Sequence, residues 1–274
     1  MSRTLPTAAR APTVLVTGGG LRLGAQICRQ FAQSGWDVWC HYQHSADAAQ
    51  ALCDDLNRQH GVARTVQADL SNAAQRARMM GHIAQTSGSL QCLVNNASSF
   101  EPDHANQLNV QAARNQIEVN LLAPMELSSL MAQSVPTEGD GPHGTRSIIH
   151  ILDQKVFNLN PDYFSYTVSK LALERTVALQ AQALSPHIRV CGVAPGLMFL
   201  SGPQSQENFD AASTMNLMRR PTDPAQVAAS CVFLAENPCI TGVTLTVDNG
   251  QHLIPLPRDV MFVVDDFMKA RNAS

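Results

Sequence analysis

The sequence is poor in charge, and the charges that it has are not clustered. Asp, Glu, Lys and Arg make up 15% of the 274 residues, whereas a typical soluble domain has roughly 25%. The formal net charge is −3, and Lys and Arg form no run. Because nucleic-acid binding needs a basic surface, we do not expect a nucleic-acid partner. The low charged fraction instead predicts apolar surface that another copy of the chain covers.

Long apolar runs and paired cysteines are also missing. No stretch approaches the roughly eighteen apolar residues of a membrane span, and residues 1–12 lack the apolar segment of a signal peptide. We therefore expect neither membrane insertion nor secretion. The seven cysteines form no CxxC pair, and most lie among apolar neighbours, where thiols behave as small hydrophobic groups. These features favour the reducing cytoplasm.

Short apolar runs alternate with longer helical patterns along most of the chain. We expect strands near residues 13–17, 36–42, 62–67, 90–95, 146–151, 187–193 and 243–247. We expect helices near residues 23–34, 46–59, 72–86, 109–133, 163–184 and 224–236. This alternation is typical of βαβ units. It predicts an α/β fold, a single-domain Rossmann fold whose doubly wound, seven-stranded parallel sheet carries helices on both faces.

The pattern divides the chain into three parts. These are a flexible N-terminal arm (1–12), the Rossmann domain (13–250) and a C-terminal tail (251–274), whose role stays open. Within the domain, residues 134–146 are rich in Pro and Gly and predict a connecting loop. Residues 197–223 lack periodicity, and a segment of that length predicts a lid or a substrate loop.

A glycine-rich turn follows the first predicted strand. Gly18, Gly19 and Gly20 come directly after Thr17, and the run Leu21-Arg22-Leu23-Gly24 leads into the first helix. Glycines at such a turn let the backbone approach a pyrophosphate, which the helix N-terminus attracts. An ordinary glycine-rich turn is the alternative. The turn predicts a dinucleotide site, with Gly18, Arg22 and Leu23 in contact with the cofactor.

The second strand indicates which dinucleotide binds. An acidic residue at its end would hold the ribose 2′-hydroxyl of NAD, but this strand ends in Cys40-His41-Tyr42-Gln43-His44-Ser45. Arg22 is placed to reach a 2′-phosphate, so NADP(H) is favoured. The alternative is that Arg22 is solvated and His44 has no role. His41 and His44 have no third ligand nearby in sequence, so no metal site is predicted.

Polar residues follow the third and fourth strands. Asp69 either accepts a hydrogen bond from the adenine amino group or caps the helix that begins near Ser71. Asn95-Asn96-Ala97-Ser98 ends the fourth strand, at the carboxyl edge where open α/β sheets bind ligands. A polar strand end without a ligand is the alternative.

Tyr166 and Lys170 are four residues apart in a predicted helix, so they lie on one face of it. An ammonium beside a phenol favours the phenolate, and we expect Lys170 to lower the pKa of Tyr166 from about 10 toward working pH. Tyr166 is then a usable proton donor or acceptor. Taken alone the pair is more often a surface feature than a site, and its position after the fifth strand gives it weight.

Pro124 lies inside a predicted helix, four residues after Asn120. Proline has no N–H, so it cannot donate to the Asn120 carbonyl, and that carbonyl is expected to hold a water molecule. A plain proline kink is the alternative.

These motifs resemble the short-chain dehydrogenase/reductase family over residues 13–250. The resemblance rests on Thr17-Gly18-x-x-x-Arg22-x-Gly24, Asp69, Asn95-Asn96-Ala97, Asn120, Tyr166-x-x-x-Lys170 and Pro195-Gly196. The family usually has glycine in place of Arg22 and serine in place of Asp153. Both differences are similar to the pteridine reductase branch, which includes dihydromonapterin and dihydrofolate reductases of bacteria. That branch often has arginine where this chain has His44.

The resemblance implies a role for each matching residue. Tyr166 would be the acid, Asp153 would pair with it, and Lys170 would bind the nicotinamide ribose. The carbonyl of Asn120 would hold a relay water. Phe100 would stack a flat pterin against the nicotinamide, with Ser98 and Tyr163 hydrogen-bonding to it. The residues expected at NADP(H) are Gly18, Arg22, Leu23, Tyr42, His44, Ser45, Asp69, Leu70, Asn96, Ala97, Tyr166, Lys170, Pro195 and Gly196.

The sequence therefore predicts an NADPH-dependent reductase of a pterin or a dihydrofolate-type substrate. A generic carbonyl or 3-oxoacyl reductase is the main alternative, but that chemistry normally uses a neutral serine, and an ionised Asp153 would repel the developing oxyanion. A non-enzymatic NADP-binding regulator would not need Tyr166, Lys170 and Asn120 together. The family resemblance also implies a homotetramer that pairs the helices near residues 109–133 and 163–184.

Overall fold

The computed structural model describes residues 11–134, 146–200, 202 and 204–272. The predicted N-terminal arm and the loop at 134–146 lie outside this part of the chain, apart from their edge residues. Among the described residues, no helix is both long and apolar enough to cross a bilayer.

One sheet of seven parallel strands forms the centre of the molecule, in the order β3-β2-β1-β4-β5-β6-β7. All seven strands were predicted, and their bounds agree within two residues. The strands are β1 (Thr13–Val16), β2 (Asp37–Tyr42), β3 (Ala63–Gln67), β4 (Cys92–Asn95), β5 (Arg146–Ile151), β6 (Ile188–Pro195) and β7 (Thr244–Val247).

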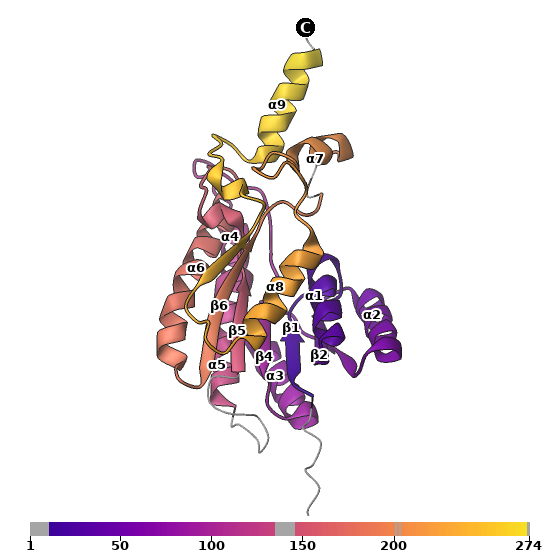
Figure 1. Cartoon of the computed structure of the whole chain (residues 1–274). Coiled ribbons are helices and arrows are strands. Elements are labelled where there is room, and N and C mark those ends of the chain that lie inside the picture. The colour runs from indigo at the N-terminus through magenta and orange to yellow at the C-terminus, as the bar shows by residue number, and fades with distance from the viewer. Residues whose placement is uncertain (1–10, 135–145, 201, 203, 273–274) are drawn as a thin grey trace, which may run out of the picture.

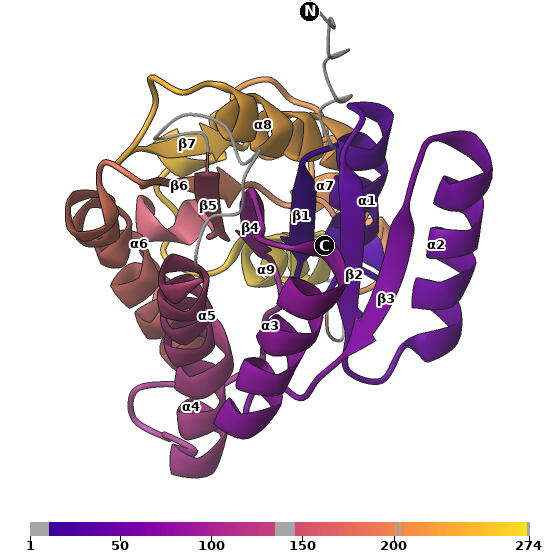
Figure 2. The same cartoon turned by 90° about the horizontal axis from the view of Figure 1, so that it is seen from below.

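Helices cover both faces of the sheet, as predicted (Figure 2). On one face lie α1 (Arg22–Gln33), α2 (Ala46–Gln59) and α8 (Pro224–Glu236). On the other lie α3 (Ala73–Ser87), α4 (Val110–Ile117), α5 (Ala123–Gln133) and α6 (Phe164–Leu184). The chain order reverses between β1 and β4, so the carboxyl ends of these neighbouring strands flank the crevice where such sheets bind ligands.

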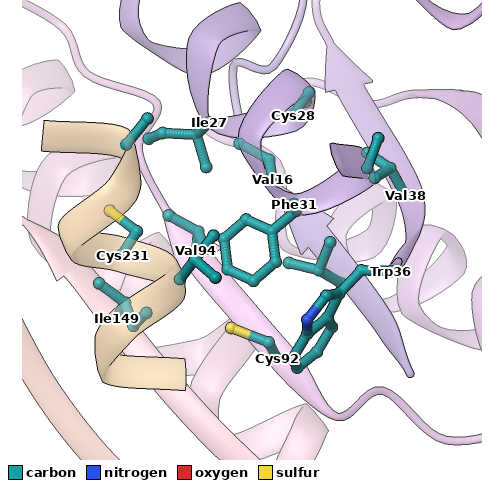
Figure 3. Packing of buried hydrophobic residues seen from close by; sticks show 14 of the residues in the cluster. Val16, Ile27, Cys28, Phe31, Trp36, Val38, Cys92, Val94, Ile149 and Cys231 are labelled. Carbon is teal, nitrogen blue, oxygen red and sulfur yellow. The ribbon is translucent and has the colours of Figure 1, made fainter. Parts of the chain in front are cut away.

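Alternation along the strands divides the apolar core in two. Val14 and Val16 of β1 belong to the cluster under α1 and α8, whereas Leu15 belongs to the cluster on the opposite face. Side chains on a strand point alternately to the two faces, so a fully apolar strand must be covered on both. In the first cluster Phe31 and Trp36 pack edge to face, with ring centroids 5.1 Å apart (Figure 3).

Several helices begin at a side chain that accepts hydrogen bonds from the first turn. Asn72 caps α3, Asn109 caps α4 and Asp223 caps α8. Such caps satisfy backbone N–H groups that have no partner within the helix. Helix α1 differs, because its N-cap residue Leu21 provides no side-chain acceptor. The first N–H groups of α1 therefore depend on another acceptor.

Three predicted segments differ from what was expected. The helix predicted at 109–133 is divided by a π-helical turn, η1 (Glu118–Leu122), between α4 and α5. The segment 197–223 contains the short helix α7 (Gln206–Ala212). The C-terminal tail forms the 3-10 turn η3 (Gln251–Leu253) and helix α9 (Val260–Asn272). Figure 1 shows α7 and α9 next to each other beyond the end of the sheet, with the C-terminus at the far end of α9.

Candidate active site

A cavity of about 530 Å³ opens at the carboxyl edge of the sheet. Its walls come from the glycine turn, the ends of β4, β5 and β6, the start of α6 and the start of α9 with the residue before it. Most of the residues predicted for the site line it, namely Gly18, Arg22, Leu23, Leu70, Asn96, Ala97, Ser98, Phe100, Asp153, Tyr163, Tyr166, Lys170, Pro195 and Gly196. Tyr42, His44, Ser45, Asp69 and Asn120 do not line it.

The glycine turn is held by His41, for which the sequence predicted no metal site and no other role. The backbone N–H of Gly18 donates to Nδ1 of His41 at 3.0 Å, and Nε2 of His41 lies 3.1 Å from the carbonyl oxygen of Ala68. Burial lowers the pKa of His41 to about 4, so the ring is neutral at pH 7. A neutral ring with a proton on Nε2 satisfies both contacts. His41 therefore fixes the turn.

The ends of β1 and β4 are also tied together across the cavity floor. The hydroxyl of Thr17 accepts from the N–H groups of Asn96 and Ala97, at 2.9 and 3.0 Å. The side-chain amide of Asn96 donates to the carbonyl oxygens of Thr17 and Gly18, at 2.9 and 3.2 Å. The side chain of Asn96, a predicted cofactor residue, thus hydrogen-bonds to the glycine turn.

The turn and helix α1 together suit a dinucleotide. Gly18 has a positive φ of 62°, and an added Cβ on Gly24 would overlap the carbonyl oxygen of Gly18. The backbone of the turn therefore packs closely against the start of α1. Gly18 and Gly24 line the cavity, as do Leu21, Arg22 and Leu23. Because α1 has no side-chain cap, its N-terminal N–H groups are suited to phosphate oxygens. The residues present fit a pyrophosphate.

Arg22 faces a different neighbour from the one predicted. Its Nη2 donates to the carbonyl oxygen of Leu200 at 2.9 Å, and its guanidinium lies over the ring of Phe199, 5.1 Å from the centroid. Both partners follow β6. From the sequence, this guanidinium was expected at the 2′-phosphate beside the end of β2. Ser45 at that end lies instead next to Gly20, whose added Cβ would be 3.1 Å from the serine Oγ.

Asp69 is engaged by its own turn. Its Oδ1 accepts from the N–H and the hydroxyl of Ser71, at 2.9 and 2.8 Å, while Asn72 provides the cap of α3. The cap of this helix is therefore Asn72 and not Asp69, while the expected adenine contact of Asp69 stays a prediction. The next residue, Leu70, lines the cavity, and its carbonyl oxygen accepts from the buried guanidinium of Arg76.

Helix α6 brings Tyr166 and Lys170 to the cavity, as their spacing predicted. The hydroxyl of Tyr166 donates to Oδ2 of Asp153 at 2.9 Å. The other oxygen of Asp153 accepts from the N–H of Lys155 at 2.9 Å and caps the 3-10 turn η2 (Gln154–Val156). Asp153 therefore lies against the hydroxyl of Tyr166 with its carboxylate oriented by the backbone.

The prediction that Lys170 lowers the pKa of Tyr166 is wrong for this structure. Burial and the neighbouring Asp153 raise the pKa of Tyr166 well above 10. Nζ of Lys170 donates to the carbonyl oxygen of Ile151 at 2.8 Å and not to the phenol, and burial lowers the pKa of Lys170 to about 8. Burial likewise raises the pKa of Asp153. The phenol is thus protonated at pH 7, which is the form that donates a proton.

Asn120 lies in the π-helical turn η1 and is fully buried. Its Oδ1 accepts from the N–H of Ser99 at 2.7 Å and from the hydroxyl of Ser98 at 3.2 Å. Its Nδ2 donates to the hydroxyl of Ser169 at 3.0 Å. The side chain therefore joins the segment after β4 to α6. Pro124 is the second residue of α5, in the first turn after η1, where its missing N–H is tolerated.

Aromatic rings form one wall of the cavity. Phe100 stacks on Tyr163 with ring centroids 4.2 Å apart and an interplanar angle of 23°. Phe100 also meets Tyr166 edge to face at 4.6 Å, and Tyr163 lies nearly parallel to Phe262 at 6.2 Å. Phe100 remains 40% exposed, so its ring has surface available to a ligand. Such a wall suits a flat, aromatic substrate.

The C-terminal segment, whose role the sequence left open, closes another wall. Asp259, Val260 and Met261 line the cavity. The carboxylate of Asp259 accepts from Nζ of Lys155 at 3.2 Å, and the guanidinium of Arg258 pairs with Asp162 at 2.8 Å. These pairs join elements about 100 residues apart in the chain. No local sequence pattern predicts these ion pairs, because the two partners of each pair are far apart in the chain.

Comparison with known proteins agrees with this geometry. A family model described as "Enoyl-(Acyl carrier protein) reductase" matches residues 22–252. The chain belongs to the short-chain dehydrogenase/reductase family. Pteridine reductase 1 of Leishmania tarentolae is 32% identical over 294 residues, which cover 91% of this chain and 99% of that protein. Dihydromonapterin reductase of Shigella flexneri is 26% identical over 242 residues, which cover 88% of this chain and 96% of that protein.

Solved structures of this reductase family have the same fold. FolM alternative dihydrofolate reductase 1 of Brucella canis, in complex with NADP, is 33% identical with a TM-score of 0.83, covering 89% of this chain and 94% of that one. The angucycline C-6 ketoreductase LanV, with bound NADP, is 26% identical with a TM-score of 0.80, covering 89% and 96%. The predicted fold class and family are confirmed.

Proposed function

We propose that this reductase uses NADPH to reduce a pterin or a dihydrofolate-type substrate. The observation that carries the proposal is the hydrogen bond between Tyr166 and Asp153, at 2.9 Å, in a cavity with Phe100 in its wall. A carboxylate at this place suits a substrate that is protonated on a ring nitrogen. The names of the relatives above support the same substrate class, and two of the neighbouring structures hold NADP.

The chain's own residues provide the binding and the proton. When bound, the cofactor supplies the hydride. The glycine turn and the N-terminus of α1 would hold its pyrophosphate, and Lys170 would contact the nicotinamide ribose. Tyr166 Oη donates its proton to a ring nitrogen of the substrate. Asp153 accepts a hydrogen bond from that hydroxyl and orients it toward the substrate. The remaining predicted cofactor contacts stay part of this proposal.

The proposal is tested by substrate preference. The wild-type protein should oxidise NADPH with a dihydropterin or dihydrofolate, and Asp153→Ser should lower that rate at least about tenfold while lowering any ketone reduction less. The reason is that serine lacks the carboxylate that accepts from the hydroxyl of Tyr166 and that suits a substrate protonated on a ring nitrogen. Asp223→Ser is a matched control, because serine can still cap α8 far from the cavity. Brisk ketone reduction with every pterin untouched would defeat the proposal.

Carbonyl reduction is the second candidate, favoured by the similarity to the ketoreductase LanV. The same assay separates the two candidates, because the neutral serine hydroxyl that Asp153→Ser introduces suits a ketone, so ketone reduction should fall less than pterin reduction. A regulator that only binds NADP would turn over neither substrate.

We also propose that the protein acts as a homotetramer in the cytoplasm. Its seven cysteines are free thiols, which fits a reducing compartment. Apolar side chains are exposed on α4, η1, α5 and α6, the helices expected at the interface, and these are Val110, Leu122, Met125, Val168 and Leu179. Such exposed apolar surface is typical of subunit contacts.

Light scattering should therefore report four copies, and Leu179→Glu should reduce that mass, because a charge in a buried contact is costly. Leu179 is 64% exposed in the single chain. Phe267→Glu on α9, where the phenylalanine is 66% exposed, is the matched control and should leave the mass unchanged. A wild-type protein that stays monomeric at micromolar concentration would reject the tetramer.

A further inference from the structure

Gln154 is a buried polar group in the cavity wall that the mechanism above does not use. It directly follows Asp153, lines the cavity and is 7% exposed. Its Oε1 accepts no hydrogen bond from any described residue. A buried acceptor without a donor is costly, because it has lost its hydrogen bonds to water. Where a buried acceptor without a donor lines a ligand cavity, a hydrogen-bond donor of the ligand can satisfy it.

Other polar side chains of the same wall are held by the protein. Nε2 of Gln204 donates to Asn208 at 2.8 Å. Oε1 of Gln251 accepts from the N–H of Leu197 at 2.9 Å. Lys155 is engaged by Asp162 and Asp259. Gln154 differs from these neighbours, since the structure shows no protein donor for its oxygen.

The backbone of Gln154 is nevertheless well fixed. Residue 154 begins the 3-10 turn η2, which the carboxylate of Asp153 caps, and its carbonyl oxygen accepts from the N–H of Phe157 at 3.0 Å. The side chain is thus presented from a rigid turn next to the group that orients Tyr166. Because no donor in the described part of the chain holds Oε1, rotation about the last side-chain bond can bring the oxygen to the cavity face without breaking a hydrogen bond to it.

We propose that Gln154 accepts a hydrogen bond from an N–H group on the edge of the ring substrate and so determines specificity for a nitrogen heterocycle. Pterins carry an amino group and a ring N–H on one edge, whereas a simple ketone carries neither. The inference rests on the proposed function and names a residue that recognises the substrate by a hydrogen bond. A site that pairs a ligand N–H rejects an analogue without it, because the acceptor is then left unpaired.

Gln154→Met tests this inference, since methionine has similar length and no amide oxygen. The KM for a dihydropterin should rise about tenfold, the loss expected for one hydrogen bond at a buried partner, while kcat changes less than about twofold. Two inhibitors sharpen the test: pterin, and dimethyllumazine, a pteridine whose N–H groups are all replaced. The variant should bind pterin about tenfold more weakly and dimethyllumazine as tightly as the wild type does.

Gln251→Met is the comparison variant, because it removes an oxygen that already serves the backbone of Leu197. It should weaken both inhibitors alike. Equal weakening of both inhibitors by Gln154→Met would show a structural role and overturn the inference, as would an unchanged KM. These outcomes leave pterin reduction by the wild type intact. Absence of any pterin reduction by the wild type would instead overturn the proposed function together with the inference.

Discussion

Replacing Tyr166 by phenylalanine is expected to lower kcat at least about 100-fold while NADPH binds within about twofold of the wild-type affinity. The hydroxyl is the only group that the substitution removes, and it donates to Asp153 at 2.9 Å. Proton transfer by a positioned side chain typically contributes about 10² to 10⁴ to the rate. The ring itself, packed against Phe100, stays in place. Single-turnover kinetics and a fluorescence titration with NADPH measure the two quantities.

Tyr163→Phe is the matched control for this prediction. Tyr163 lines the same cavity and stacks on Phe100, but Asp153 does not accept its hydroxyl. Its removal should act on the KM of the substrate more than on kcat, because Tyr163 is expected to bind and not to protonate. Lys170→Met should harm both the rate and cofactor binding. If the Tyr166 variant kept most of its rate, another group would have to be the acid.

A second large effect is expected for Gly24→Ala, which should weaken NADPH binding at least about tenfold. The added Cβ would overlap the carbonyl oxygen of Gly18 and lie 2.8 Å from Nδ2 of Asn96. Neither atom can move at low cost, because the Gly18 oxygen belongs to the backbone and the Asn96 amide hydrogen-bonds the end of β4 to the turn. Overpacking costs about 1–3 kcal/mol, and each kcal/mol lowers the melting temperature of a chain of this size by about 2–4 °C. Calorimetry and cofactor titration measure both effects.

Gly81→Ala is the corresponding control. Gly81 lies in α3, and no atom comes within 4 Å of an added Cβ. Alanine is the better helix former by about 1 kcal/mol, so this variant should be slightly more stable and bind NADPH normally. Equal cofactor affinity in the Gly24 and Gly81 variants would contradict the close approach of backbone to cofactor at the turn.

The strands and the catalytic pair were predictable because their signals are local. A strand buried on both faces needs a continuous apolar run, so Thr13–Val16 and its counterparts could be located from composition alone. The four-residue spacing of Tyr166 and Lys170 places them on one helical face wherever that helix lies. The glycine turn was predictable because Gly18, Gly19 and Gly20 directly follow the first strand, and the structure adds that Gly24 has no room for a Cβ. The family resemblance added Asp153 as the partner of Tyr166.

Contacts between distant segments were not predictable in this way. The expected effect of Lys170 on Tyr166 assumed that neighbours on a helix face interact, but burial and the carbonyl oxygen of Ile151 decide where the ammonium points. Arg22 was assigned to the end of β2, and its reach to Leu200 depends on how the segment after β6 crosses the turn. Burial and orientation come from the whole fold, so the sequence near a residue does not contain them.

The sequence by itself determined the sheet, the glycine turn and the positions of Tyr166 and Lys170, because each depends on local periodicity or on one residue's conformational freedom. Only the tertiary structure decided that His41 holds the turn, that the start of α9 forms a cavity wall and that the oxygen of Gln154 has no donor among the described residues. Each of these depends on partners brought together by long-range packing, and hydrogen bonding in a buried site is settled by that packing.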